Sequence, residues 1–248
     1  MSVDYNRSVP NFAGLFVTSL PFPSVFVAIV NPLLGPDHRL ANWFHARLTE
    51  HFVTFLRALS EPGSAQWIGV VVFIGVVFFA WKQRWLSLVT FVVAVPGGML
   101  LNELVKILVH RPRPFAAGPF VDWAGYSFAS GHTIGATLLY GQIALFLVPA
   151  IKARRWRTLT KCSVVLVVVL VGFSRIALGA HYLSDVLAAM ALGSAWLTVC
   201  VFATKPVRRR AAAPMILPEN ITPALLPIET PALVPVEITA SSELLVPR

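Results

Sequence analysis

The chain has 248 residues, of which 56% are hydrophobic and 12% are charged, and its formal net charge at pH 7 is +9. Soluble globular proteins carry about 25% charged residues, so this composition excludes an ordinary soluble domain and indicates a polytopic membrane protein. The basic residues occur in short runs between apolar segments, as they do in cytoplasmic loops. They do not form a basic face with interleaved aromatic residues, so nucleic acid is not an expected partner.

The N-terminal part of the chain predicts one segment inside the membrane and one helix on the membrane surface. Residues 8–36 are uncharged but contain five prolines, which kink or end helices, so we expect a broken span or a membrane-embedded segment. Residues 36–60 place apolar side chains at helical spacing opposite a charged face. This pattern predicts an amphipathic helix that lies along the membrane surface.

A transmembrane helix needs about 20 mostly apolar residues, and suitable segments follow one another from residue 62. The predicted fold class is therefore an all-α, polytopic membrane helical bundle with about six transmembrane helices and the surface helix between the first and the second. The five spans expected after the surface helix are 62–81, 85–102 with an extension toward residue 109, 133–151, 162–174 with an extension beyond Arg175, and 186–204.

Three basic runs set the predicted orientation in the membrane: 82–84, 152–157 and 205–210. Placing all three in the cytoplasm follows the positive-inside rule, and alternation of the spans then puts 109–132 and 175–185 on the opposite side. We therefore expect a multi-pass protein of the inner (plasma) membrane. Its polar segments would face the periplasm or the extracellular space, and its C-terminus would be cytoplasmic.

The composition changes from residue 211 onward. Prolines recur too often for a helix there, and no periodic pattern buries a face. We expect a membrane-embedded domain over 1–210 and a disordered cytoplasmic tail over 211–248. The last four residues, LVPR at 245–248, look like the remnant of a cleavable tag.

The first polar cluster on the outer side is cationic and follows the span that begins at residue 85. It contains Lys106, Arg111 and Arg113. Lys and Arg are scarce on this side of membrane proteins, so the cluster favours an anionic ligand over a solvated helix end. Cations of this kind bind phosphoryl groups through charge-assisted hydrogen bonds. Glu103 is expected to pair with Lys106.

The second cluster is Ser130-Gly131-His132, directly before the span at 133–151. Serine caps a helix start, glycine lets a ligand approach the backbone, and the free N–H groups at a helix N-terminus bind phosphate. His132 would then protonate a leaving oxygen. The alternative is a capped helix with an interfacial histidine.

The third cluster contains Arg175, His181 and Asp185. His181 and Asp185 are four residues apart and would share one face of a helix. The carboxylate would accept the proton of one ring nitrogen and leave the other nitrogen free to attack. The alternatives are a His–Asp pair on a helix surface in the headgroup zone and an arginine that snorkels to the headgroups.

Together the clusters supply cations, backbone donors, two histidines and one carboxylate. This set suits phosphoryl transfer that depends on positioning and charge neutralisation. The sequence contains no carboxylate cluster for magnesium and no Cys/His spacing for zinc. We therefore expect neither a metal nor another cofactor.

The order and spacing of these residues resemble the type 2 phosphatidic acid phosphatase family, which is related to the vanadium haloperoxidases. The family pattern is Lys, six residues, Arg-Pro; then Pro-Ser-Gly-His; then Ser-Arg, five residues, His, three residues, Asp. The chain matches it with Lys106 and Arg113-Pro114, with Ser130-Gly131-His132, and with Ser174-Arg175, His181 and Asp185. One position departs, because Ala129 stands where the pattern has proline.

The resemblance implies a role for each matched residue. His181 would be the nucleophile that forms a phosphohistidine, Asp185 would orient it, and His132 would be the general acid. The phosphoryl oxygens would be held by Lys106, Arg113, Arg175, Ser130 and the Gly131 backbone. Arg111 lies outside the pattern.

The implied function is that of an integral-membrane hydrolase of a lipid phosphate or diphosphate. Undecaprenyl pyrophosphate is the first substrate to test; phosphatidic acid, phosphatidylglycerol phosphate and diacylglycerol pyrophosphate follow. A lipid phosphotransferase that modifies lipid A is a related alternative. A transporter of phosphorylated lipid is the alternative from another class, and it would need discontinuous helices at the midplane. The sequence does not specify an oligomeric state.

Overall fold

The computed structural model describes residues 33–115 and 123–212. Every secondary-structure element in this part is an α-helix or a 3-10 helix, and this part contains no strand. Five stretches are long and apolar enough to cross a membrane, which confirms the spans expected after residue 62. The predicted first span lies outside the described residues, apart from its last four. The long helices are α4 (Ala65–Trp81), α5 (Trp85–Val109), α6 (Gly131–Leu147), α7 (Arg154–Ala177) and α8 (Leu183–Ala212).

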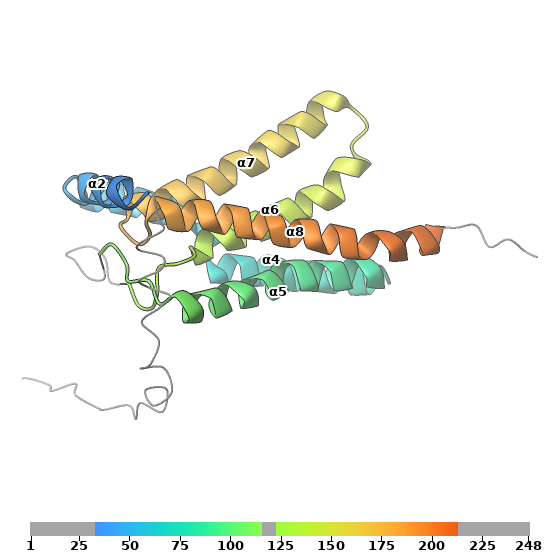
Figure 1. The fold of residues 1–248 in the computed structure, drawn as a ribbon. Coiled ribbons are helices and arrows are strands. Elements are labelled where there is room, and N and C mark those ends of the chain that lie inside the picture. The colour runs from blue at the N-terminus through green and yellow to red at the C-terminus, as the bar shows by residue number, and fades with distance from the viewer. Residues whose placement is uncertain (1–32, 116–122, 213–248) are drawn as a thin grey trace, which may run out of the picture. The chain divides into compact units, whose positions relative to one another are not determined.

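Successive long helices run in opposite directions, as Figure 1 shows. The basic run 82–84, between α4 and α5, and the run 152–157, at the start of α7, lie at one end of the bundle, toward which α8 runs. The described connecting segments 110–115, 123–130 and 178–182 lie at the other end. The three polar clusters therefore meet at a single end of the bundle.

The predicted surface helix is two helices instead of one: α2 (Leu34–His45) and α3 (Glu50–Ser60). Thr49 is the N-cap residue of α3, and its hydroxyl accepts a hydrogen bond from the Phe52 N–H at 3.4 Å. The apolar residues of this pair pack against the ends of α7 and α8. The buried side of the pair thus contacts protein. The members of this cluster are Phe44, Val53, Leu56, Ile176, Ala177, Leu178 and Val186.

The long helices bury a common core and expose large apolar side chains on their outer faces. Ala94, Leu138 and Ala189 are fully buried where α5, α6 and α8 meet. Phe73 and Ile74 of α4 are 69% and 60% exposed. Such surfaces are costly in water and suit hydrocarbon.

Helix α5 continues through Pro96. A transporter would need discontinuous helices at the midplane, but α5 is uninterrupted at Pro96-Gly97-Gly98, so this stretch does not support that alternative. Short 3-10 turns, η1 (Glu61–Gly63) and η2 (Val148–Ala150), precede α4 and follow α6. The described residues up to Arg208 form one compact unit, and the last residues of α8, from Arg209, are assigned to a second.

Candidate active site

The turn between α7 and α8 presents His181. Gly179 has a φ of +67°, and a Cβ at this position would lie 2.9 Å from the Phe115 ring, so the turn requires glycine. His181 precedes the first residue of α8 and is only 2% exposed. The expectation that His181 and Asp185 share one helix face is wrong, because only Asp185 is helical.

Two neighbours determine the tautomer of His181. Its Nδ1 lies 2.7 Å from the carbonyl oxygen of Ser127, which can only accept a hydrogen bond. Its Nε2 lies 3.4 Å from Nη1 of Arg113, which can only donate. The proton is therefore on Nδ1, and the Nε2 lone pair faces the guanidinium group.

Asp185 is fixed by groups other than His181. One carboxylate oxygen accepts a hydrogen bond from the Tyr182 N–H at 2.9 Å, and the other accepts from Arg111 at 2.6 Å. The carboxylate lies 3.7 Å from His181 Nδ1, too far for a good hydrogen bond and close enough to stabilise positive charge on the ring.

The His181 imidazole is neutral at pH 7. Its pKa lies at about 4, below the ordinary value of 6.5, because burial disfavours the charged ring. Asp185 opposes this shift, while the charges of Arg175 and Arg113 reinforce it. A neutral imidazole with a free Nε2 lone pair is the form that can attack an electrophile.

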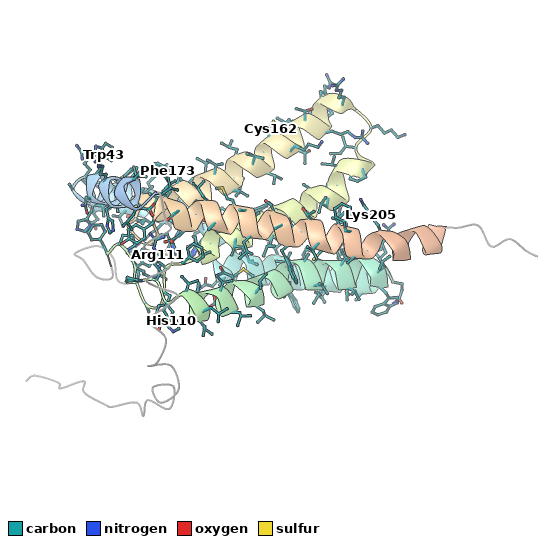
Figure 2. The ribbon with its side chains drawn as sticks, in the orientation of Figure 1. Trp43, His110, Arg111, Cys162, Phe173 and Lys205 are labelled. Carbon is teal, nitrogen blue, oxygen red and sulfur yellow. The ribbon has the colours of Figure 1, made fainter. Side chains whose placement is uncertain are left out.

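Arg111 joins Asp185 to helix α2 through a buried ion-pair network. Its Nη2 donates to Asp37 at 2.9 Å while its Nη1 donates to Asp185 at 2.6 Å. Asp37 also accepts hydrogen bonds from the Ser184 N–H at 2.9 Å and from the Ser184 hydroxyl. Figure 2 shows Arg111 at the end of the bundle that is distant from Cys162 and Lys205.

Asp37 keeps its negative charge although it is buried. Burial raises the pKa of its carboxyl group, but the hydrogen bonds from Ser184 and the charge of Arg111 outweigh this, so the pKa lies below its ordinary value. Residue spacing could not predict this pairing, because Asp37 and Arg111 are 74 positions apart. Asp37 and Ser184 were not among the site residues predicted from the sequence. The ion pairs of Arg111 with Asp37 and Asp185 were not predicted either.

Arg113 is held by backbone carbonyl groups of two loops. Its Nε and Nη2 donate to Gly125 and Ala124, and its Nη1 donates to Ala180, all at 3.0–3.1 Å. Burial lowers the pKa of Arg113, and Asp185 opposes that shift, but arginine remains protonated in proteins. The contacts orient a permanent cation toward His181 Nε2.

The second cluster begins α6, as predicted, but Ser130 does not cap the helix with its side chain. The Ser130 hydroxyl instead accepts a hydrogen bond from the Thr133 hydroxyl at 3.0 Å. Gly131 is the first residue of α6, and a Cβ there would point at Lys106 Nζ, 3.4 Å away. Lys106 also pairs with Glu103 at 2.7 Å, as expected. His132 is half-buried and interacts electrostatically with Arg175, His181, Lys106 and Arg113.

Arg175 does not snorkel to the membrane surface. It lies in the last turn of α7, is 4% exposed and places its guanidinium carbon 4.5 Å from the centre of the Trp123 ring. Its Nε is buried without a hydrogen-bond partner among the described residues. The third cluster therefore brings a partly unsatisfied cation to the same end as His181.

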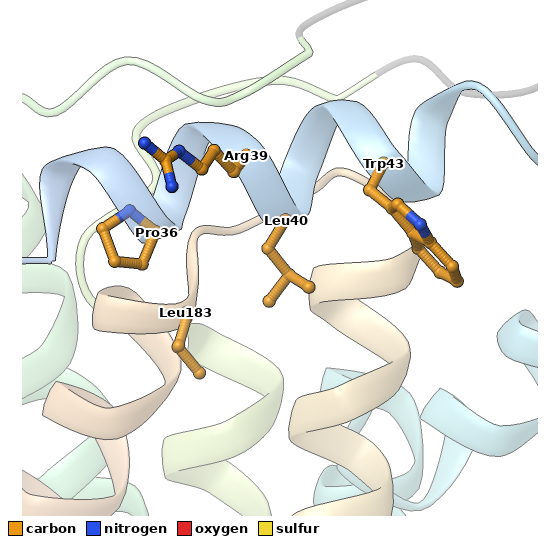
Figure 3. A pocket seen from close by; sticks show the side chains of 5 residues that line it. All are labelled: Pro36, Arg39, Leu40, Trp43 and Leu183. Atoms are coloured by element: carbon orange, nitrogen blue, oxygen red, sulfur yellow. The ribbon is translucent and has the colours of Figure 1, made fainter.

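An apolar cleft of about 550 Å³ lies beside this polar centre, between α2 and the start of α8. Figure 3 shows Leu40 of α2 and Leu183 of α8 directed into the same space, with Trp43 at one side. Leu183 is next to Ser184, which binds Asp37, so the cleft adjoins the ion-pair network. Among the described residues, no group of three or more His, Cys, Asp or Glu side chains is placed to hold a metal ion.

A sequence profile of the PAP2 superfamily matches residues 85–209, which include every predicted site residue. The chain belongs to the PAP2 superfamily. This membership confirms the family resemblance drawn from the sequence.

Two named bacterial phosphatases are similar to the chain over part of their length. It is 34% identical to phosphatidylglycerophosphatase B of Bacillus subtilis (strain 168) over 125 residues, which are 50% of this chain and 61% of the relative. It is 34% identical to a lipid A 1-phosphatase of Rhizobium johnstonii over 174 residues, 65% of this chain and 59% of the relative. The chain thus spans about three fifths of the length of these relatives.

Solved structures share the fold. The PAP2-type phosphatidylglycerolphosphate phosphatase from Bacillus subtilis superposes with a TM-score of 0.65 at 24% identity, covering 75% of this chain and 92% of that one. LpxE from Aquifex aeolicus gives a TM-score of 0.52 at 18% identity, covering 67% and 95%. At these identities the likeness concerns the fold of a transmembrane PAP2 protein.

Proposed function

We propose that this PAP2 protein is a metal-independent hydrolase of a membrane lipid phosphate or diphosphate and acts through a phosphohistidine on His181. One observation carries the proposal: a neutral, buried imidazole directs its unprotonated Nε2 toward an arginine at the same end as a helix N-terminus and two further cations. Phosphoryl transfer needs this combination of a positioned nucleophile and charge neutralisation.

The proposed first step forms a bond between His181 Nε2 and phosphorus and breaks the bond from phosphorus to the leaving oxygen. His132 gives its proton to that oxygen. As the P–N bond forms, positive charge develops on the ring and is stabilised by Asp185 at 3.7 Å. Arg113, Arg175 and Lys106 neutralise the phosphoryl oxygens.

The proposed second step is hydrolysis of the intermediate. A water molecule attacks phosphorus, His132 takes up its proton, and the P–N bond breaks to release inorganic phosphate and neutral His181. His181 is almost fully buried, whereas Lys106, Arg113 and His132 are half-buried. Substrate would therefore enter past these three residues.

A lipid substrate also needs an apolar surface next to the phosphoryl pocket. The cleft between α2 and α8 supports this part of the proposal, because it is lined by Pro36, Leu40, Trp43 and Leu183 and has Arg39 at its edge. The basic runs occur at the opposite end of the bundle, so by the positive-inside rule we propose that the active site faces away from the cytoplasm of a plasma-membrane protein.

A phosphate-release panel in EDTA tests this function. The panel contains undecaprenyl pyrophosphate, phosphatidic acid, phosphatidylglycerol phosphate and lipid A. The last two are included because the relatives are named as a phosphatidylglycerophosphatase and a lipid A phosphatase. We expect phosphate release from at least one lipid, with EDTA changing the rate less than about twofold. Release that stops completely in EDTA and returns with a divalent cation would contradict the proposal.

The pH dependence follows from the pKa of His181, which is about 4. Neutral imidazole is the nucleophile, so kcat/KM should rise with pH through that value and lose about tenfold per unit below it. The profile is measured in detergent and corrected for the ionisation of the substrate phosphate, followed separately by phosphorus NMR. A corrected acid limb centred near 6.5, the ordinary histidine value, would mean that the essential histidine is not the buried one.

A further inference from the structure

Asn102 carries a buried amide group that the mechanism above does not use. It lies on α5, is 0% exposed, and neither its Nδ2 nor its Oδ1 has a hydrogen-bond partner within the part of the chain that the structure describes. An amide buried without partners is costly. Such a group needs an explanation, and a ligand or a water molecule is the usual one.

The position of the amide indicates what that ligand is. Asn102 precedes Lys106 by four residues, one helical turn, so both side chains lie on the same face of α5. A Cβ on Gly131 would lie 3.8 Å from Asn102 Nδ2 and 3.4 Å from Lys106 Nζ. The amide and the ammonium group therefore flank the first residue of α6.

The start of α6 is suited to an anion. Three backbone N–H groups of its first turn precede the first intrahelical bond, from Ile134 N to Ser130 O. Ser130 makes no side-chain cap, because its hydroxyl is bonded to Thr133. A helix N-terminus without a cap, beside a lysine and an unpartnered amide, is a site for a phosphoryl oxygen.

We propose that Asn102 is a further phosphate-binding residue, whose amide NH₂ donates a hydrogen bond to the phosphoryl oxygen that lies between Lys106 and the N-terminus of α6. The inference rests on the proposed phosphatase function and adds a ligand to its pocket. An amide suits this position better than a second lysine, because it donates without adding charge next to Lys106. It also has a vacant acceptor, Oδ1, for a water molecule or a substrate hydroxyl.

Two substitutions at Asn102 separate phosphate binding from folding. Asn102→Leu removes the unpartnered amide at similar size, so the melting temperature in detergent should stay equal or rise. The kcat/KM for the preferred lipid phosphate should nevertheless fall roughly 10- to 100-fold, the loss expected for one donor to a reacting oxyanion. Asn102→Asp is isosteric, but its negative charge opposes phosphate, so its loss should be larger still.

Gln142 supplies a matched control. Its Oε1 is also buried without a partner among the described residues, but it lies on α6 eleven residues beyond Gly131, which is roughly 16 Å along the helix. Gln142→Leu should likewise leave the melting temperature equal or raise it, and it should leave kcat/KM within about twofold of wild type.

A binding measurement keeps this inference separate from the catalytic one. Inorganic phosphate should stabilise wild-type protein against heat, and Asn102→Leu should lose most of that shift while Gln142→Leu keeps it. If phosphate raises the melting temperature of wild type and Asn102→Leu equally, or if their kcat/KM values are equal, the proposed role of Asn102 is wrong. The amide would then be hydrogen-bonded to water instead of phosphate. If wild type binds phosphate through Asn102 but hydrolyses no lipid phosphate, the proposed function fails and the binding site stands.

Discussion

Replacing His181 with asparagine should lower kcat by at least about 10⁴-fold, because removal of a catalytic nucleophile costs several orders of magnitude. The asparagine amide can still donate to the Ser127 carbonyl, which accepts from Nδ1 at 2.7 Å in the wild type, but it has no nitrogen lone pair to attack phosphorus. Binding of inorganic phosphate should persist, since the cations are unchanged. Turnover is measured as phosphate release from the preferred lipid.

His110→Asn is the matched control for this substitution. His110 directly follows α5 and has a φ of +52°, a conformation that asparagine tolerates well, and its ring contacts only Tyr126 among the described aromatic side chains. This variant should retain activity within about threefold of wild type. If His181→Asn folds, binds phosphate and turns over substrate at more than about a hundredth of the wild-type rate, the nucleophile is another group.

Replacing Arg111 with lysine should lower kcat roughly 100-fold with little change in KM. Lysine keeps the charge but has no planar fork to bond Asp37 and Asp185 at the same time. Asp185 would move relative to His181, and displacement of about 1 Å from the reacting geometry can cost about 10²-fold. Asp37→Asn should cause a smaller loss of the same kind, because it weakens the bond that orients Arg111.

The exposed first-turn glutamate of α3 provides the control, since Glu50→Gln removes one negative charge from a neighbouring helix without touching Arg111. It should leave kcat unchanged. A purely structural role for the network would lower the melting temperature of Arg111→Lys and Asp37→Asn but leave kcat per folded molecule intact. Wild-type kcat in the folded fraction would therefore refute a positioning role for Arg111.

The spans could be predicted from sequence because hydrocarbon imposes length and apolarity on each of them, and alternation then brings the clusters to one end. The break between α2 and α3 was missed although Thr49 followed by Glu50 is a helix-start signal. The amphipathic pattern continues across the break. It indicates which face is buried, but it does not indicate whether lipid or protein covers that face.

Contacts between distant segments could not be predicted from spacing. The four-residue interval between His181 and Asp185 suggested a shared helix face, but the turn at Gly179 sets their geometry. The Ser127 carbonyl, not Asp185, accepts the hydrogen bond from the His181 Nδ1–H. The pairing of Arg111 with Asp37 depends on how α2 packs. The motif reports which residues are present, and packing decides which of them touch.

The location of the covalent phosphate tests the central claim most directly. Purified protein is mixed with the preferred lipid carrying a labelled phosphate, quenched in alkali within one turnover, digested and mapped by mass spectrometry. We predict label on His181, stable in alkali and lost in acid, and no label in His181→Asn. Label on any other residue would contradict the account. So would full turnover by the wild type if no phosphoenzyme can be trapped, either from the wild type or from a variant lacking His132.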